Sequence, residues 1–248
     1  MQTDYSLIFT LAILWSVVGF GAYYFLSMAR TAALEVEQNV ENSSPQSEFQ
    51  LSPGIQIRKI LIQRFLGFLF LGLGSAVLIL LLKDKPLTDF GLGFSFEQPV
   101  PWWSYLAVPL VVVVGFFTAK SESNLAMYPQ IRVKRWTPSL LLLSGISWVL
   151  FLVAYEFLFR GFLLYSSLLV LEPVPAIAIN CSLYAFAHFY KGPGETFGAI
   201  PVGIFVCYLT VHTGNIWSAV IFHSLMALSN EWFSLRAHPE MKIQSRKE

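Results

Sequence analysis

Long apolar runs follow one another along most of the 248-residue chain, and they constrain its fold more than any other feature. A helix that crosses the hydrocarbon core of a bilayer needs about 20 mostly apolar residues. Seven runs approach or exceed this length: 7–28, 60–82, 102–119, 139–171, 174–190, 196–212 and 215–235. Only 12% of the residues are charged, against about 25% in ordinary soluble domains. The sequence therefore predicts an all-α fold, a polytopic transmembrane helix bundle with about seven spans.

The first and fourth runs need separate interpretations. The run 7–28 follows a start without Lys or Arg and is longer than the apolar part of a cleaved signal peptide, so we expect a retained transmembrane helix. The run 139–171 is too long for one perpendicular span, because a helix rises about 1.5 Å per residue and the hydrocarbon core is about 30 Å thick. This segment must tilt, extend past the bilayer, or break near Gly161.

Composition divides the chain into five parts. They are an N-terminal transmembrane helix (1–29), a polar flexible linker (30–58), a two-helix part with loops (59–136), a core that carries the polar site (137–235) and a basic tail (236–248). Lys and Arg gather in the first, third and fifth loops and in the tail, whereas the opposite side carries only Lys83 and Lys85. We therefore expect a multi-pass protein of the cytoplasmic (plasma) membrane, with its N-terminus outside and its C-terminus in the cytoplasm. A net charge of +1 without a basic block excludes nucleic acid as a partner.

Two opposite charges interrupt the fourth apolar run. Glu156 and Arg160 are four residues apart with Glu156 first, which on a helix places them on one face as a favourable pair. A charged side chain at membrane depth costs about 2.5–3.5 kcal/mol unless it is paired or faces a wet cavity. Two interpretations stay open. Either the charges neutralise each other, or Arg160 positions Glu156 as a base or an orienting carboxylate in a cavity.

Two histidines and a loop carboxylate are the other polar outliers. His188 ends the fifth run on a stripe with Asn180 and Tyr184, and His223 lies within the seventh. Imidazole serves acid–base chemistry near neutral pH and binds divalent metals, so both are candidate metal ligands, for zinc for example, although their spacing matches no compact zinc motif. Alternatively, each is an interhelical hydrogen-bond partner. Glu195 follows a Gly-Pro-Gly turn and is either a helix-start acid or a carboxylate that folds back beside His188.

The order of these motifs resembles the CAAX protease and bacteriocin-processing family (CPBP, with Abi-type relatives) of intramembrane endopeptidases. The resemblance covers about residues 137–230 and includes the run Thr-Gly-Asn-Ile-Trp at 213–217 before the last histidine. The family pattern is Glu-Glu-x-x-x-Arg, then Phe-x-x-x-His, then His-x-x-x-Asn. Glu156 matches the second Glu and Arg160 the Arg, while His188 and His223 match the two histidines.

Three positions depart from this pattern. Tyr155 stands where the family has its first Glu, the base that activates water; Tyr184 replaces the Phe; and Ala227 stands where the oxyanion-stabilising Asn would be. The resemblance implies hydrolysis of a peptide bond in a peptide or lipid-modified protein, by a glutamic-protease or metalloprotease mechanism. With the first Glu absent, Glu156 or Glu195 would be the base.

The departures leave two other functions open. One is a catalytically inactive membrane scaffold or immunity-type protein of the same fold, which would sequester a partner. The other is a small transporter, in which the same charged cluster would line a proton or substrate path.

Overall fold

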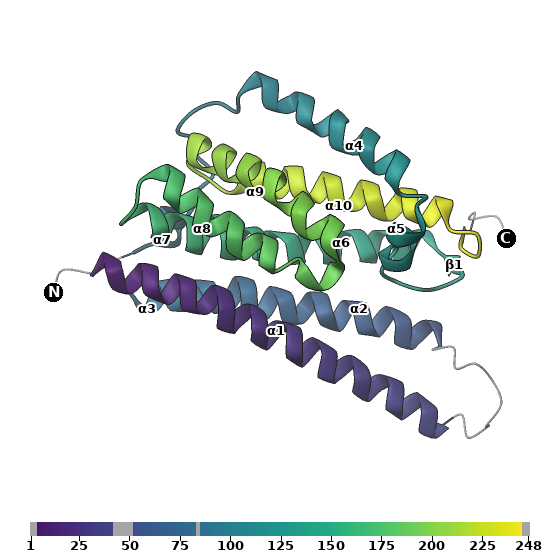
Figure 1. The fold of residues 1–248 in the computed structure, drawn as a ribbon. Helices are drawn as coiled ribbons and strands as arrows, with labels where there is room; N and C mark the ends of the chain where they lie inside the picture. Colours follow the sequence, from purple (N-terminus) through teal and green to yellow (C-terminus); the bar gives the residue numbers. More distant parts are fainter. Residues whose placement is uncertain (1–3, 42–51, 83–84, 245–248) are drawn as a thin grey trace.

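The helices lie side by side along the long axis of the molecule, and the two ends of the chain lie at opposite ends of that axis (Figure 1). A computed structural model describes residues 4–41, 52–82 and 85–244. The N-terminal half contains α1 (Tyr5–Glu41), α2 (Pro53–Gly67), the π-helical η1 (Phe68–Leu73), α3 (Gly74–Leu81), the 3₁₀ turns η2 (Leu87–Phe90) and η3 (Trp102–Leu106), α4 (Ala107–Thr118) and α5 (Glu122–Met127).

The C-terminal half carries the polar residues singled out by the sequence. It contains β1 (Arg135–Trp136), α6 (Pro138–Glu156), the π-helical η4 (Phe157–Leu163), α7 (Leu164–Leu168), α8 (Pro173–Phe186), the 3₁₀ turn η5 (Phe189–Lys191), α9 (Pro193–Thr213), α10 (Trp217–Ala237) and β2 (Lys242–Ile243). The two short strands pair in parallel, Arg135 with Lys242 and Trp136 with Ile243, which fastens the chain after α10 beside the start of α6.

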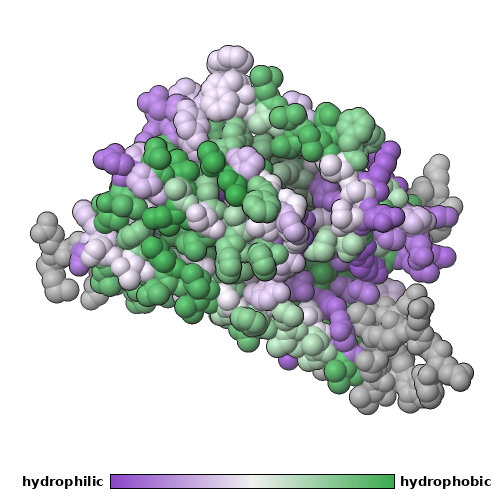
Figure 2. Space-filling model, viewed as in Figure 1, coloured by the Kyte–Doolittle hydropathy of each residue, from purple (hydrophilic) through white to green (hydrophobic). Residues whose placement is uncertain are grey.

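The predicted all-α membrane helix bundle is confirmed. Among the described residues, four helices are long and apolar enough to cross a membrane: Tyr5–Val36, Pro53–Leu81, Pro138–Leu168 and Pro193–Thr213. Trp102–Thr118 and Pro173–Phe186 are apolar but shorter, and α10 carries more polar residues. Hydrophobic side chains cover the middle of the face in Figure 2, and hydrophilic ones gather at its right, the end where α5 and β1 lie in Figure 1.

The structure shows how the long fourth apolar run, 139–171, is built around Gly161. The helix continues without interruption from Pro138 to Leu168, but it is π-helical from Phe157 to Leu163. Gly161 lies in that stretch, and a Cβ there would meet the Phe157 ring at 2.5 Å and the Phe90 carbonyl oxygen at 2.9 Å. Of the three alternatives, a break near Gly161 is replaced by a local change of helix geometry that lets another segment approach closely. Such π-helical insertions are frequent at functional sites.

The predicted flexible linker over 30–58 is corrected at both ends. Helix α1 continues to Glu41, and α2 begins at Pro53 with the Ser52 side chain accepting a hydrogen bond from the Ile55 N–H. Residues 42–51, the middle of the predicted linker, lie outside the described residues. An ion pair between Lys59 and Glu35 joins the two helices. Polar residues at the two ends of the predicted linker can therefore continue the neighbouring apolar helices, because each helix supplies a charged partner for the other.

Candidate functional site

A buried ion pair with a histidine beside it marks the centre of the bundle. Glu156 is the last residue of α6, Arg160 lies one turn further in η4, and His223 comes from α10. His223 Nδ1 is 2.5 Å from Glu156 Oε1, and Arg160 Nη1 is 3.2 Å from Glu156 Oε2. The Arg160 guanidinium also lies over the Tyr184 ring at 4.0 Å. Glu156 and Arg160 are fully buried. The Glu156 carboxylate contacts His223 Nδ1 from the buried side and so fixes the orientation of the ring.

Helix α8 is tied to the π-helical stretch by a buried amide. Asn180 Nδ2 donates to the Phe159 carbonyl oxygen at 2.5 Å, and Asn180 Oδ1 accepts from Cys207 Sγ at 3.1 Å. Eight residues later, His188 Nδ1 lies 2.9 Å from the Tyr184 carbonyl oxygen. A carbonyl accepts, so Nδ1 carries the proton and Nε2 is left for another partner. The predicted polar stripe therefore has two purposes. Asn180 anchors α8 to the π-helical stretch, and His188, just after the helix, carries a ring nitrogen that is free among the described residues.

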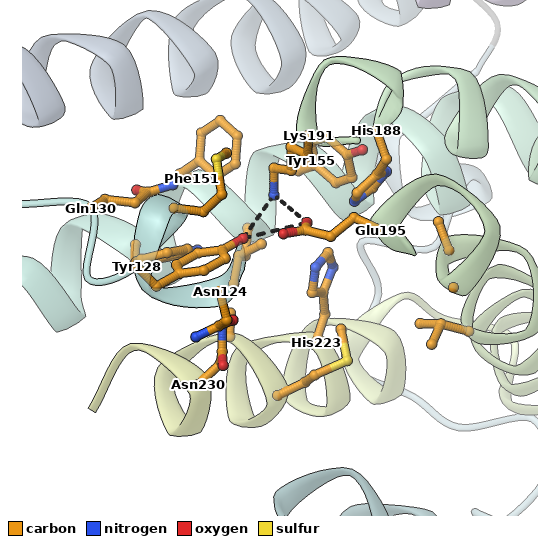
Figure 3. A pocket seen from close by; sticks show the side chains of 18 of the residues that line it. Asn124, Tyr128, Gln130, Phe151, Tyr155, His188, Lys191, Glu195, His223 and Asn230 are labelled. Atoms are coloured by element: carbon orange, nitrogen blue, oxygen red, sulfur yellow. Dashed lines mark hydrogen bonds and ion pairs between the residues drawn. The ribbon is translucent and has the colours of Figure 1, made fainter. Parts of the chain in front are cut away.

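The two histidines, Glu195 and Tyr155 line one cavity of about 960 Å³ (Figure 3). Tyr184 lines the same cavity. These side chains come from α6, α8, the turn after it, α9 and α10. Neither Glu156 nor Arg160 lines the cavity. Tyr155 does, and its ring lies 5.9 Å from the His223 ring and 6.1 Å from the His188 ring. The residue in place of the family's first Glu therefore occupies the cavity wall between the histidines.

Glu195 belongs to a polar group with Lys191 and Tyr128. Its Oε2 is 3.2 Å from Lys191 Nζ and 3.5 Å from the Tyr128 hydroxyl, and Lys191 Nζ is 3.1 Å from that hydroxyl (Figure 3). Glu195 opens the first turn of α9 after Gly192, whose φ of 97° turns the chain back. The structure therefore combines both alternatives, because Glu195 starts a helix and also lies in the cavity that His188 lines.

Burial and charge keep Lys191 and Tyr128 as hydrogen-bond donors. Burial raises the pKa of the Tyr128 hydroxyl above its ordinary value, so it remains protonated. Burial alone lowers the pKa of the Lys191 ammonium, but Tyr128, Tyr190 and Glu195 more than offset this and hold the pKa well above its usual range. The wall beside Glu195 thus carries an O–H and an N–H donor at neutral pH.

Sequence reasoning missed Lys191 and Tyr128 as site residues. Lys191 is a cation of the fifth loop in the sequence, and its spacing of four from Glu195 is the signal that points to their ion pair. Tyr128 lies in a loop 67 residues before Glu195, and nothing in the sequence pattern joins them. Ala227 lines the cavity where the family would have an amide, and Asn230 lines it further along α10 with its side chain donating to Asn124 Oδ1 at 3.1 Å.

The described residues do not complete a metal centre. Among them, no group of three or more His, Cys, Asp or Glu side chains is arranged to hold a metal ion. His223 Nδ1 is taken by Glu156, His188 Nδ1 by a carbonyl oxygen, and Glu195 by Lys191 and Tyr128. Within the described site, the Nε2 atoms of His188 and His223 are left over, and two nitrogens do not complete the coordination shell of zinc, which takes four ligands. We therefore derive no step through a metal from His188 and His223.

Fold and site together define an integral membrane protein with a polar centre buried among its helices. Residues 136–229 match a family model named Rce1-like, which is described as type II CAAX prenyl endopeptidase Rce1-like. The predicted resemblance to the CAAX protease and bacteriocin-processing family is confirmed over this part of the chain, which is similar to the Rce1-like model. Comparison with curated proteins and with solved structures gave no match. The match includes Glu156, Arg160, His188, Glu195 and His223, and it leaves out α1 to α5.

Proposed function

We propose that this protein is an intramembrane endopeptidase that hydrolyses a peptide bond in a membrane-associated peptide or lipid-modified protein. The observation that carries the proposal is that Glu195, His188 and His223 line one cavity although they come from separate elements. Burying such groups in an apolar bundle is costly unless they are paired or face a wet cavity. The match of residues 136–229 to a protease family supports the same class of reaction.

Glu195 is the general base in this proposal. Its side chain is 34% exposed, whereas that of Glu156 is fully buried behind His223. A base must reach a water molecule within hydrogen-bond distance, so Glu195 is placed for that task and Glu156 is not. Glu156 and Arg160 are then positioning residues. The carboxylate holds His223 Nδ1 and leaves Nε2 to orient water, and Arg160 keeps the carboxylate charged and fixed.

The hydrolysis balances with these groups alone. The water oxygen attacks the carbonyl carbon and a C–O bond forms, while one water proton passes to Glu195. The negative charge that develops on the carbonyl oxygen needs donors, a contribution of about 2.7–4 kcal/mol for each one in known oxyanion holes. Lys191 supplies N–H donors on this wall, and the Tyr128 O–H, which donates to Glu195 before the attack, turns to the oxyanion once Glu195 has taken the proton; Ala227 has no donor. The C–N bond then breaks, and Glu195 returns the proton to the departing nitrogen.

We further propose that the cavity faces the cytoplasm. Arg132 and Lys191 line it from loops in which positive charge gathers, and Lys59 lines it from the first turns of α2. Such loops remain on the cytoplasmic side of a membrane. A substrate would then approach from the cytoplasmic leaflet, with the C-terminus of this protein on the same side.

Cleavage by the reconstituted protein tests the proposal. The probe is a quenched fluorescent peptide with an S-farnesyl cysteine, added to liposomes that carry wild type or Glu195→Gln. Loss of a general base is expected to lower kcat by about 10²–10⁴-fold. Glu122→Gln, an exposed carboxylate on α5, is the matched control and should keep the wild-type kcat.

Two results would contradict the proposal at different levels. Wild-type kcat in folded Glu195→Gln would remove Glu195 as the base. Absence of cleavage by folded wild type, with both the farnesylated peptide and its unmodified form, would refute the peptidase function and favour a non-catalytic scaffold.

A further inference from the structure

The cavity that Glu195 lines also has a strongly cationic part. Four cations line it, Lys59, Arg64, Arg132 and Lys191, and among the described lining residues Glu195 is the one carboxylate. Lys59 pairs with Glu35, and Lys191 pairs with Glu195. The two arginines are left with a weaker counter-charge. They are supplied by α2 and by the loop after α5, outside the part of the chain that matches the protease family.

Arg64 is held rigidly at the cavity wall. Its Nη1 donates to the Ser144 carbonyl oxygen and to the Ser147 hydroxyl, both at 2.8 Å, and its Nη2 donates to Gln130 Oε1 at 3.1 Å. The guanidinium lies 4.3 Å from the centre of the Trp148 ring. The side chain is 5% exposed, and its Nε has no hydrogen-bond partner among the described residues. A buried guanidinium fixed in this way is pre-organised for an anion, because little side-chain entropy is lost on binding.

One carboxylate serves both arginines, and it lies outside the cavity lining. Glu231 Oε1 is 3.9 Å from Arg64 Nη2, too far for a hydrogen bond, and Oε1 has no hydrogen-bond partner among the described residues. Glu231 Oε2 accepts from the Gln130 N–H at 3.1 Å and acts on Arg132 only through its charge. Arg132 is half-buried and forms no ion pair within 4.0 Å in the described part of the chain. Two guanidinium groups therefore line the cavity with one remote carboxyl group behind them.

The surroundings fit an oxoanion on an elongated, partly apolar ligand. Side-chain amides of Gln63, Asn124, Gln130 and Asn230 line the same cavity, and apolar residues of α4, α9 and α10 line the rest. Contacts connect this end with the catalytic wall, since Tyr128 beside Glu195 stacks on Trp148 at 6.0 Å and Trp148 lies under Arg64. An extended peptide advances about 3.3 Å per residue, so a few residues would reach from one end to the other.

We propose that Arg64 and Arg132 form an oxoanion subsite that binds a carboxylate or a phosphate at the end of a ligand whose remainder lies toward Glu195. The carboxylate would be the free C-terminus of a substrate peptide, and the phosphate would be that of an anionic lipid headgroup. The first source rests on the proposed function. Planar guanidinium groups recognise both anions, and a buried site strengthens the interaction.

Binding without turnover tests the subsite. Wild type is placed in nanodiscs of phosphatidylcholine, and the probe is a dye-labelled, S-farnesylated octapeptide with either a free carboxylate or a carboxamide at its C-terminus. The carboxylate form is expected to bind at least tenfold more tightly. This preference should fall below twofold in Arg132→Gln and in the double variant Arg64→Gln/Glu231→Gln. The double variant leaves no unpaired buried charge, and Arg132 is half-buried, so both variants should fold.

Matched controls and a lipid arm make the outcome decisive. Arg58→Gln and Arg135→Gln remove exposed arginines near Arg64 and Arg132 that do not line the cavity, and they should keep the preference. If the two peptides bind equally, phosphatidylglycerol is added and its retention by the purified protein is measured by native mass spectrometry. Retention by wild type but not by Arg132→Gln identifies the lipid phosphate as the anion. Equal peptide binding and equal lipid retention in wild type and both variants would overturn the subsite, whether or not the protein cleaves peptides.

Discussion

The buried pair of Glu156 and Arg160 should be strongly coupled in stability. Both side chains are fully buried, and Arg160 Nε and Nη2 have no hydrogen-bond partner among the described residues, so Glu156 is the guanidinium's principal counter-charge. Glu156→Gln keeps the side-chain shape and an oxygen for His223, but it leaves Arg160 uncompensated. Breaking a buried pair from one side costs about 3–5 kcal/mol. For a chain of this size that corresponds to a fall in Tm of roughly 6–20 °C. Arg160→Gln should also destabilise strongly.

A double-mutant cycle separates the pair from its members. Thermal unfolding of Glu156→Gln, Arg160→Gln and the double variant is followed by tryptophan fluorescence in one detergent. The double variant should be no less stable than the worse single variant, which gives a coupling energy above about 1.5 kcal/mol. The control cycle is Lys85→Gln with Asp89→Asn, a more exposed pair 3.9 Å apart with the same spacing, where about 1 kcal/mol or less is expected. Additive costs at Glu156 and Arg160 would refute the reasoning.

Two further predictions concern packing and the cavity wall. Gly161→Ala should lower the free energy of unfolding by about 1–3 kcal/mol, because the new Cβ would meet the Phe157 ring and the Phe90 carbonyl oxygen. Gly21→Ala is the control; its Cβ would meet nothing within 4 Å, so Tm should stay unchanged or rise. Equal shifts in Tm for the two variants would contradict the close approach at Gly161. Tyr128→Phe removes the hydroxyl beside Glu195 and should lower kcat in the peptide assay by about tenfold or more with a smaller effect on KM, since an oxyanion donor acts in the transition state. Tyr105→Phe, an exposed tyrosine away from the cavity, is its control, and similar kcat values for both variants would remove Tyr128 from the reaction.

The fold was predictable because the membrane imposes a simple rule on sequence. Each of the seven apolar runs corresponds to a helical segment, since backbone groups in lipid must pair within their own segment. The predicted linker failed at its ends for a related reason. Composition shows that residues 30–58 contain few apolar residues that could pack in a core. It does not show that polar residues at the ends of long helices can pair with each other, as Lys59 and Glu35 do. The π-helical stretch was not predictable in form, although Gly161 marked its position.

The candidate site was predictable where partners lie on one helix and not where loops supply them. The spacing of four placed Glu156 beside Arg160 correctly, and the family pattern placed His223 near them. Arg64, Gln130 and Tyr128 reach the cavity from segments more than 60 residues away from their partners, and no periodicity connects such distant positions. These are also the residues that lie outside the family match, so the features peculiar to this protein are the ones that sequence pattern predicts least.

The substitution at Tyr155 has a geometric consequence for the reaction. Consecutive residues on a helix point about 100° apart, so Tyr155 and Glu156 face different neighbours. The structure has Tyr155 in the cavity and Glu156 against Arg160 and His223. In the proposed reaction the carboxylate that activates water comes from another element, because Glu195 is the carboxylate among the described lining residues. The proposed function therefore has its base at the start of α9, while Glu156 contacts His223 and Arg160 as a positioning residue.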